Sequence, residues 1–198
     1  MGHMEAVIQM SEASTSHQTK AQIDAEIDLV RAAQQDPRHF EPLYRTYYKR
    51  IVTYVHHRVD DQETAFDITA QVFYVALDRL PKFRAQGVPF GAWLFSIAYT
   101  ELQQWYRKKN RANFVRIDAE GFNELMEDID DQYSSVHDER LYQALQQLEE
   151  EEMEIINLRY FEKRSFAEIS EITGQGESAC KMRVYRATDK MKKHFKKN

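Results

Sequence analysis

Residues 165–190 read SFAEISEITGQGESACKMRVYRATDK, and this stretch decides how the C-terminal part of the chain folds. Ser165, with Glu168 three residues later, has the pattern of a capping box and predicts the start of a short helix. Residues 173–176 follow as a tight turn in which glycine tolerates a positive φ. A second helix with a basic face is expected from Glu177 onwards. A short helix, a four-residue turn and a basic helix are typical of a helix-turn-helix, whose second helix enters the major groove of DNA.

The charge of the chain is unevenly distributed. The formal net charge is -5, but residues 177–198 contain eight basic and two acidic residues and so carry a net charge of +6. Phosphate binding depends on such local patches more than on the overall sum. On the second helix, Lys181, Arg183 and Arg186 are long enough to reach base edges or phosphates. The alternative is an ordinary helical hairpin with a solvated basic face, and the spacing alone leaves both interpretations open.

The composition narrows the class of protein. The 198 residues suffice for one large domain or two small ones, and 42% hydrophobic with 30% charged residues is a globular composition. Only 6 glycines and 4 prolines are present, which favours helices. No apolar run approaches the roughly 18 residues that cross a bilayer, and no signal-peptide pattern occurs, so no membrane insertion is expected. Cys180 is the only cysteine, which excludes an internal disulfide and a thiolate metal site and favours a cytoplasmic protein.

The hydrophobic periodicity predicts two small helical domains and no sheet. Residues 1–20 form a polar tail that begins with a sequence typical of a cloning scar, and we expect this tail to be disordered. Apolar residues that recur every three or four positions predict helices over residues 22–35, 40–59, 65–80, 89–107, 139–149, 151–160, 165–172 and 177–195. Residues 113–138 are acidic and almost without periodicity, so they are expected to be a linker. The predicted fold is therefore all-α, with a first domain over residues 21–112 and a second over residues 139–198.

A second candidate site lies at residues 93–111, where aromatic side chains are followed at once by a basic cluster. Aromatic rings stack on unpaired bases while basic groups hold the backbone, which is the combination that binds single strands. The alternative is a buried stripe with a basic cap, since Trp93, Leu94, Ile97 and Ala98 have core spacing. Elsewhere, His56 and His57 point about 100° apart on a helix, which disfavours a metal site. The sequence contains no phosphate loop and no nucleophile with a base, so we expect neither an enzyme nor a cofactor.

Several segments in this order resemble the sigma-70 family of RNA polymerase sigma factors, of the extracytoplasmic-function (ECF) type. They are the helix with residues 67–73 (DITAQVF), Phe83-Arg84, residues 90–98 (FGAWLFSIA), the basic cluster, the acidic linker, residues 158–162 (LRYFE) and the helix-turn-helix. The similarity extends over roughly residues 24–195. The resemblance implies a sigma region 2-like bundle and a sigma region 4-like helix-turn-helix.

The resemblance also implies partners and contact residues. The partners are core RNA polymerase, promoter DNA and an anti-sigma factor. Core polymerase would be bound by Asp67, Ile68, Gln71 and Val72. The −10 element would be captured and melted by Phe83, Arg84, Phe90, Tyr99, Thr100, Gln103, Gln104, Arg107, Lys108 and Arg111. The −35 element would be read by Ser178, Ala179, Lys181, Met182, Arg183 and Arg186.

The chain departs from the family pattern at a few of these positions. The family usually has an acid at Gln71, Asn at Thr100 and Asp at Gln104. It also has an apolar residue at Gln175 and a capping Ser or Asn at Gly176, where glycine caps less well by only a few tenths of a kcal/mol. These changes leave the fold unaffected. The change at Gln71 bears on affinity for core polymerase, and the others bear on the promoter sequence and on −10 readout. Two alternatives to a sigma factor are a helix-turn-helix regulator that binds duplex DNA without polymerase and a sigma-like adaptor that sequesters an anti-sigma factor.

Overall fold

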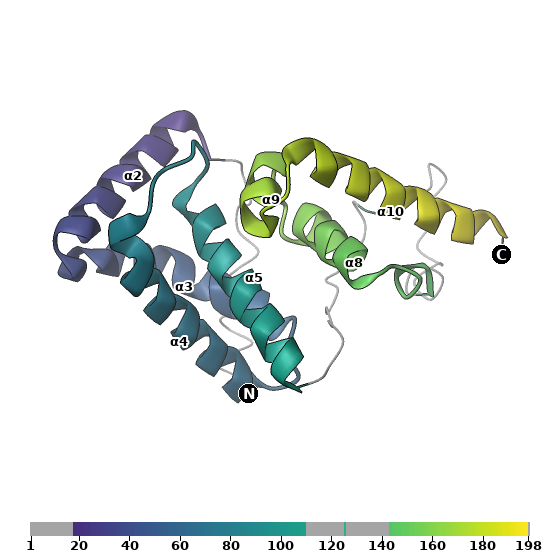
Figure 1. Cartoon of the computed structure of the whole chain (residues 1–198), viewed down its shortest axis with the longest axis horizontal. Helices are drawn as coiled ribbons and strands as arrows, with labels where there is room; N and C mark the ends of the chain where they lie inside the picture. The colour runs from purple at the N-terminus through teal and green to yellow at the C-terminus, as the bar shows by residue number, and fades with distance from the viewer. Residues whose placement is uncertain (1–17, 110–124, 126–142, 198) are drawn as a thin grey trace. The chain divides into compact units, whose positions relative to one another are not determined.

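The computed structural model describes residues 18–109, 125 and 143–197. Within these ranges the regular structure is helical and no strand occurs, so the prediction of an all-α protein is confirmed. One compact unit contains α2 (Lys20–Gln35), α3 (Glu41–His56), α4 (Gln62–Arg79) and α5 (Phe90–Lys109) (Figure 1). The other contains α8 (Glu150–Ile156), α10 (Glu177–Lys197) and most of α9 (Phe166–Thr173). Nearly all of the predicted tail and linker lie outside the described residues, as do the borders predicted after residues 112 and 138, and the predicted domain bounds stay predictions.

Local caps fix where the helices of the first unit begin and end. α2 begins at a capping box in which Thr19 and Gln22 each accept the other's backbone N–H, at 3.3 and 2.7 Å. A 3₁₀ turn, η1 (Pro37–Phe40), leads into α3. α4 is capped by Asp61, whose carboxylate accepts from the Thr64 N–H at 2.8 Å. A second 3₁₀ turn, η2 (Leu80–Lys82), ends α4, because Pro81 has no N–H to continue the helical ladder.

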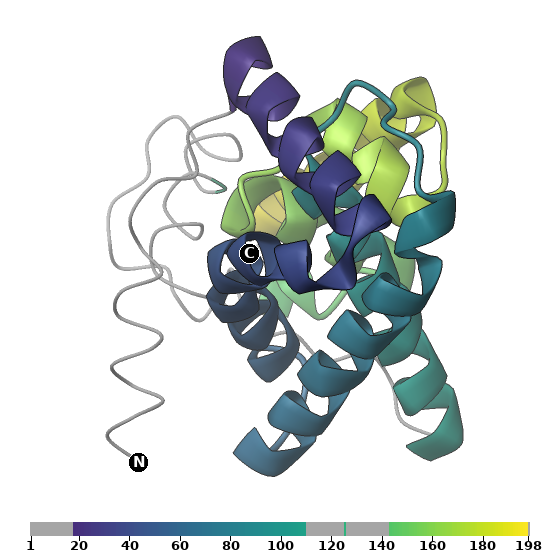
Figure 2. The same cartoon turned by 90° about the vertical axis from the view of Figure 1, so that its left-hand side faces the viewer.

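The core of the first unit is rich in aromatic rings. Phe40 makes edge contacts with Phe73 and Phe90, with ring centroids 6.4 and 6.5 Å apart. Such edge-to-face pairs add to the stabilisation that comes from burying the rings. α2 crosses this unit in front of the other helices in Figure 2 and packs against α3, α5 and η2. The aromatic contacts therefore link η1, α4 and the N-terminal end of α5.

α4 has one buried and one exposed face. Ala65, Ile68, Val72 and Ala76 are buried at helical spacing, as the apolar pattern predicts. Leu77 is 41% exposed and lies on the solvent side of the helix. The reason is geometric, because position 77 shares its face with exposed positions 66, 70 and 74 rather than with the core stripe.

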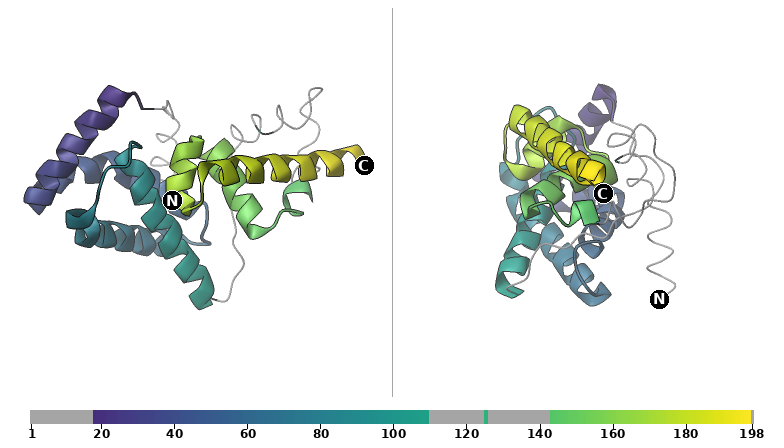
Figure 3. Two further views of the ribbon diagram at one scale, coloured as in Figure 1. Left: turned by 45° about the horizontal axis from the view of Figure 1, so that its top comes forward. Right: turned by 90° about the vertical axis from the view of Figure 1, so that its right-hand side faces the viewer.

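The second unit packs α8 along α10, whose full length is visible in Figure 3. The predicted helix over residues 151–160 is interrupted, because a π turn, η3 (Asn157–Phe161), follows α8 directly. The Glu162 N–H donates to the Asn157 carbonyl at 2.9 Å, and Lys163 has a positive φ of 52°. Of the predicted helix over residues 139–149, only residues 143–145 are described as helical, and residues 139–142 lie outside the described part.

Two kinds of feature do not occur in the described residues. None of their helices combines the length and the apolar character that a membrane span requires. No group of three His, Cys, Asp or Glu side chains is arranged there to hold a metal ion.

Candidate nucleic-acid interface

α10 presents one exposed face and one packed face. Cys180, Val184, Ala187 and Met191 recur every three or four residues and are buried against the domain. The exposed side of its first three turns contains Ser178, Ala179, Lys181, Met182, Tyr185 and Arg186. Five of these six side chains are among the predicted −35 contacts. Tyr185 is not among the predicted contacts, although it is 66% exposed and shares its helical spacing with Ser178 and Met182.

Arg183, the sixth predicted −35 contact, differs from the others. Its side chain is half-buried, and its guanidinium forms an ion pair with Glu151 of α8. Lys190 forms a second pair of this kind with Glu152 of the same helix, at 2.9 Å. These two pairs connect α10 to α8, so the charge of Arg183 is compensated within the unit. The structure therefore assigns Arg183 first to packing, and a DNA contact there would require it to release Glu151.

A cationic cluster surrounds Phe166 at the start of α9. The Lys181 ammonium lies 5.6 Å from the ring centroid and pairs with Glu177 at 2.6 Å. The Arg159 guanidinium lies 5.2 Å from the same centroid. Cations at these distances are attracted by the ring quadrupole. Arg159 is not among the predicted contacts, because a single arginine next to apolar residues has no pattern that would indicate a site.

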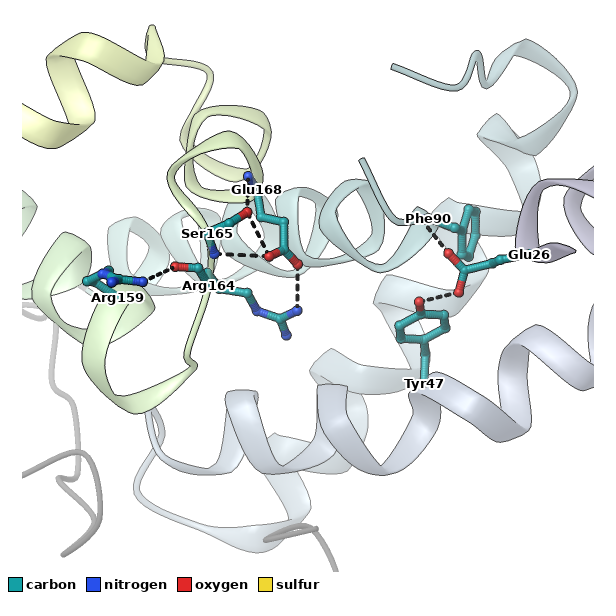
Figure 4. A network of polar contacts seen from close by, with 7 residues as sticks. All are labelled: Glu26, Tyr47, Phe90, Arg159, Arg164, Ser165 and Glu168. Atoms are coloured by element: carbon teal, nitrogen blue, oxygen red, sulfur yellow. Dashed lines mark hydrogen bonds and ion pairs between the residues drawn. The ribbon is translucent and has the colours of Figure 1, made fainter. Parts of the chain in front are cut away.

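A buried polar network fixes the helix-turn-helix (Figure 4). Ser165 and Glu168 form the predicted capping box, with the Glu168 N–H donating to the Ser165 hydroxyl at 3.2 Å and the Ser165 N–H donating back at 3.0 Å. The Glu168 carboxylate, which accepts the Ser165 N–H, also accepts from the buried Arg164 guanidinium at 3.2 Å. Burial raises the pKa of Glu168, but the Arg164 charge and the Ser165 hydrogen bonds outweigh burial, so its pKa lies below the ordinary value.

The turn between the two helices is also held by hydrogen bonds. The Ser170 hydroxyl donates to the Gln175 carbonyl at 2.6 Å, and Gly174 has φ at +69°. A positive φ strains the backbone of a residue that has a side chain, whereas glycine adopts it without strain. The Cys180 N–H donates to the Gly176 carbonyl at 3.0 Å, which starts the ladder of α10. The turn therefore sets the direction in which α10 leaves α9.

On α5, most of the predicted −10 contacts form one accessible strip. Thr100, Arg107 and Lys108 are exposed, and Tyr99, Gln103 and Gln104 are half-buried. Positions 93, 100, 103 and 107 share one side of the helix, with the indole of Trp93 at its N-terminal end. Arg111 lies outside the described residues. The strip thus combines an aromatic ring, amides and cations along about 20 Å of helix.

The loop before α5 has an aromatic side chain at its base. The Phe83 ring lies 4.9 Å from the Trp93 ring and 5.5 Å from the Phe90 ring. Phe83 is half-buried and Arg84 is exposed, which suits both for contact. Phe90 is fully buried, so this residue, predicted as a −10 contact, lies in the core beneath Phe83 and Trp93.

The predicted polymerase-contact residues also include both exposed and buried side chains. Asp67 and Gln71 are exposed on α4, and the apolar side chains of Phe66, Tyr74 and Leu77 are exposed on the same helix. Ile68 and Val72 are buried, because their helical spacing places them on the core stripe. Neither can touch a partner while the bundle is folded, so both support the surface rather than form it.

Comparison with known families agrees with this arrangement. The profile of sigma-70 region 2 matches residues 43–112, and the profile of sigma-70 region 4 matches residues 138–191. The chain belongs to the ECF sigma-70 family. It is 34% identical over 161 residues to RNA polymerase sigma factor YlaC of Bacillus subtilis, covering 80% of this chain and 92% of that protein. It is 30% identical over 163 residues to ECF RNA polymerase sigma factor BldN of Streptomyces coelicolor, covering 81% and 61%.

Two solved structures share the fold. CnrH in complex with the cytosolic domain of CnrY has a TM-score of 0.57 at 21% identity, covering 88% of this chain and 99% of that one. The sigma factor RpoE in complex with the anti-sigma factor NepR from Bartonella quintana has a TM-score of 0.53 at 20% identity, covering 79% and 96%. These structures agree with the predicted fold, while the two profiles and the two relatives confirm the predicted family. α2 precedes the matched region 2.

Proposed function

We propose that this sigma factor binds core RNA polymerase and directs it to promoters that contain a −35 and a −10 element. In this proposal α10 reads the −35 duplex, and the loop before α5 together with the strip on α5 captures the opened −10 strand. The observation that carries it is that one chain has an accessible basic helix after the turn of a helix-turn-helix and, in another unit, an aromatic and basic strip. A duplex-only regulator has no use for the second surface.

The exposed face of α10 suits the major groove. A groove about 12 Å wide admits one helix, and lysine or arginine reach guanine edges or phosphates from it. Lys181 and Arg186 are both exposed on this face. Met182 and Tyr185 add apolar surface between them, with Met182 50% exposed. Apolar side chains contact the methyl group of thymine, so this face suits a site that contains both thymine and guanine.

The surface on α5 suits a single strand. Stacking on an aromatic ring contributes about 1–3 kcal/mol per base, and it requires that the base has left the duplex. Phe83 and Trp93 stand at one end of the strip, and Arg107 and Lys108 stand at the other. Binding of this kind stabilises opened DNA and leaves duplex DNA unaffected. It therefore drives melting without nucleotide hydrolysis in this chain.

The exposed face of α4 supports a protein partner. Phe66, Tyr74 and Leu77 are large apolar residues on one solvent-facing side, with Asp67 and Gln71 beside them. A rim of polar groups around apolar residues is typical of interaction sites. We propose core polymerase as the productive partner. An anti-sigma factor is proposed as the competing one, because RpoE, which has the same fold, was solved with the anti-sigma factor NepR.

The test is a pull-down with bacterial core polymerase, followed by run-off transcription from a random promoter library. We expect a complex with polymerase and transcripts that start downstream of a defined pair of elements. Dimeric binding to duplex DNA without polymerase would instead identify a helix-turn-helix regulator. Binding to polymerase without any transcript would favour the adaptor.

A further inference from the structure

The loop between η2 and α5 is attached at both ends to α2. This loop, residues 83–89, leads from the end of α4 into the first turn of α5. At its start, the Gln34 side-chain amide donates to the carbonyls of Leu80 and Phe83, at 2.9 and 3.0 Å. At its end, the Glu26 carboxylate accepts from the Phe90 N–H at 2.7 Å. Two side chains of one helix therefore define where the loop begins and ends.

Glu26 acts as a cap supplied from another helix. Phe90 is the first residue of α5, so its N–H has no partner within that helix. The partial positive charge at a helix N-terminus favours a carboxylate there. Glu26 is buried, and 64 residues separate it from Phe90, so this cap exists only in the folded unit. A surface glutamate would be free to leave this helix end, whereas Glu26 is held.

Tyr47 of α3 fixes the position of that carboxylate. Its hydroxyl donates to the second oxygen of Glu26, and Figure 4 draws both bonds of the carboxylate. The Tyr47 ring is buried and lies 5.9 Å from the Phe90 ring. Burial, with the Glu26 charge and hydrogen bond, raises the pKa of Tyr47, so the phenol stays protonated and remains a donor at neutral pH. Both carboxylate oxygens of Glu26 are thereby occupied.

We propose that Glu26 and Gln34 are positioning residues for the promoter strand, because they fasten both ends of the loop that carries Phe83 and Arg84. This inference rests on the proposed function of the loop. The aromatic side chains that would stack on unpaired bases, Phe83 and Trp93, are adjacent to the fastened carbonyl and to the capped turn. α2 thus contributes to −10 capture without touching DNA.

The test uses two isosteric or truncating variants with matched controls on the same helix. Glu26→Gln retains the size but places an amide N–H2 opposite one of the two donors, and Gln34→Ala removes the donor to the loop. Asp24→Asn and Gln35→Ala change exposed neighbours in the same chemical way. Trp105→Phe is introduced throughout, so that Trp93, which contacts Phe83 and Phe90, is the only tryptophan.

Two readouts separate positioning from mere stability. Acrylamide quenching of Trp93 in the free protein reports the loop, and we expect the quenching constant to rise at least twofold in Glu26→Gln and Gln34→Ala but not in the controls. With polymerase and a promoter that carries 2-aminopurine in the −10 element, we expect opening to slow at least fivefold. Affinity for core polymerase should stay within twofold of wild type.

Each other outcome counts against part of the inference. Unchanged quenching with unchanged opening overturns it. Opening and polymerase affinity that fall in parallel overturn it too, because they indicate loss of the folded unit. If the wild-type chain binds no polymerase, the proposed function fails, and the quenching experiment still decides whether α2 fastens the loop. Tyr47→Phe guards against misfolding of Glu26→Gln, since it removes one hydroxyl only and should give a smaller rise in quenching.

Discussion

Replacing Gly91 with alanine should destabilise the first unit, although alanine is the better helix former. A Cβ at this position would lie 2.9 Å from both Cζ and the hydroxyl oxygen of Tyr47, and closer still to Cε1. Carbon atoms in contact are about 3.5–4.0 Å apart, so the ring or the helix must move by about 1 Å. The ring has little freedom, because its hydroxyl is bonded to Glu26 and the Arg50 guanidinium lies 5.4 Å from its centroid.

The size of the effect follows from two opposing contributions. Overpacking of a core costs about 1–3 kcal/mol. Removing glycine from a helix returns up to about 1 kcal/mol. The net loss in the free energy of unfolding is about 1–2 kcal/mol. For a domain of this size the midpoint of thermal unfolding should fall by about 5–15 °C.

Tryptophan emission gives a clean assay, since both tryptophans, Trp93 and Trp105, lie on α5. Their emission follows unfolding of the first unit and not of the second. The control is a double-mutant cycle with Tyr47→Leu, which removes the ring atoms that the new Cβ would meet. The cost of Gly91→Ala should shrink by about 1 kcal/mol or more in that background. A higher midpoint in Gly91→Ala, or an equal effect in both backgrounds, would refute the steric argument.

Three further predictions concern the second unit. Glu168→Gln leaves the buried Arg164 without its carboxylate partner, so the free energy of unfolding of this unit should fall by about 3 kcal/mol. The loss should be seen as faster amide hydrogen exchange across α9 and α10. Exchange no faster than in the control Glu171→Gln would contradict this. Because the pKa of Glu168 is lowered, its contribution is fully present above the ordinary value of 4.5 and is lost as the pH falls below it. Acid titration of wild type and Glu168→Gln by exchange should therefore show a weaker acid dependence in the variant, and equal dependence would count against the pair. The double variant Lys181→Ala, Arg186→Ala should bind promoter DNA, in complex with polymerase, with a slope of log affinity against log salt that is smaller by about 2. Its affinity for polymerase should be unchanged. An unchanged slope would exclude contacts of these two side chains with phosphates.

The sequence was sufficient for the features that depend on local signals. The Ser165 and Glu168 capping box, the Asp61 cap and the helix end at Pro81 each involve residues within three positions, so the pattern contains the whole interaction. The buried stripe of α4 also follows from spacing. That same spacing excludes Ile68 and Val72 from a contact surface, so a consistent application of helical periodicity predicts their burial.

The remaining features depend on partners that are distant in the sequence. The sequence pattern predicts Glu26 as a solvated residue on an amphipathic helix, and only the fold brings its carboxylate to the Phe90 N–H. Arg183 reads as a DNA contact, and its pairing with Glu151 requires α8 to pack along α10. The π turn at residues 157–161 has no local signature either, because it adapts the backbone to the packing around it.

The most direct test of the account is permanganate footprinting of one promoter selected from the library, with wild-type chain and core polymerase. Permanganate oxidises thymines that have left the duplex. The account predicts reactive thymines within the −10 element only when chain and polymerase are both present, and weaker reactivity when Phe83 and Trp93 are replaced together by alanine. Two results would contradict this. One is transcription that does not depend on these two rings. The other is protection of the −35 element by the chain alone, without polymerase and without melting.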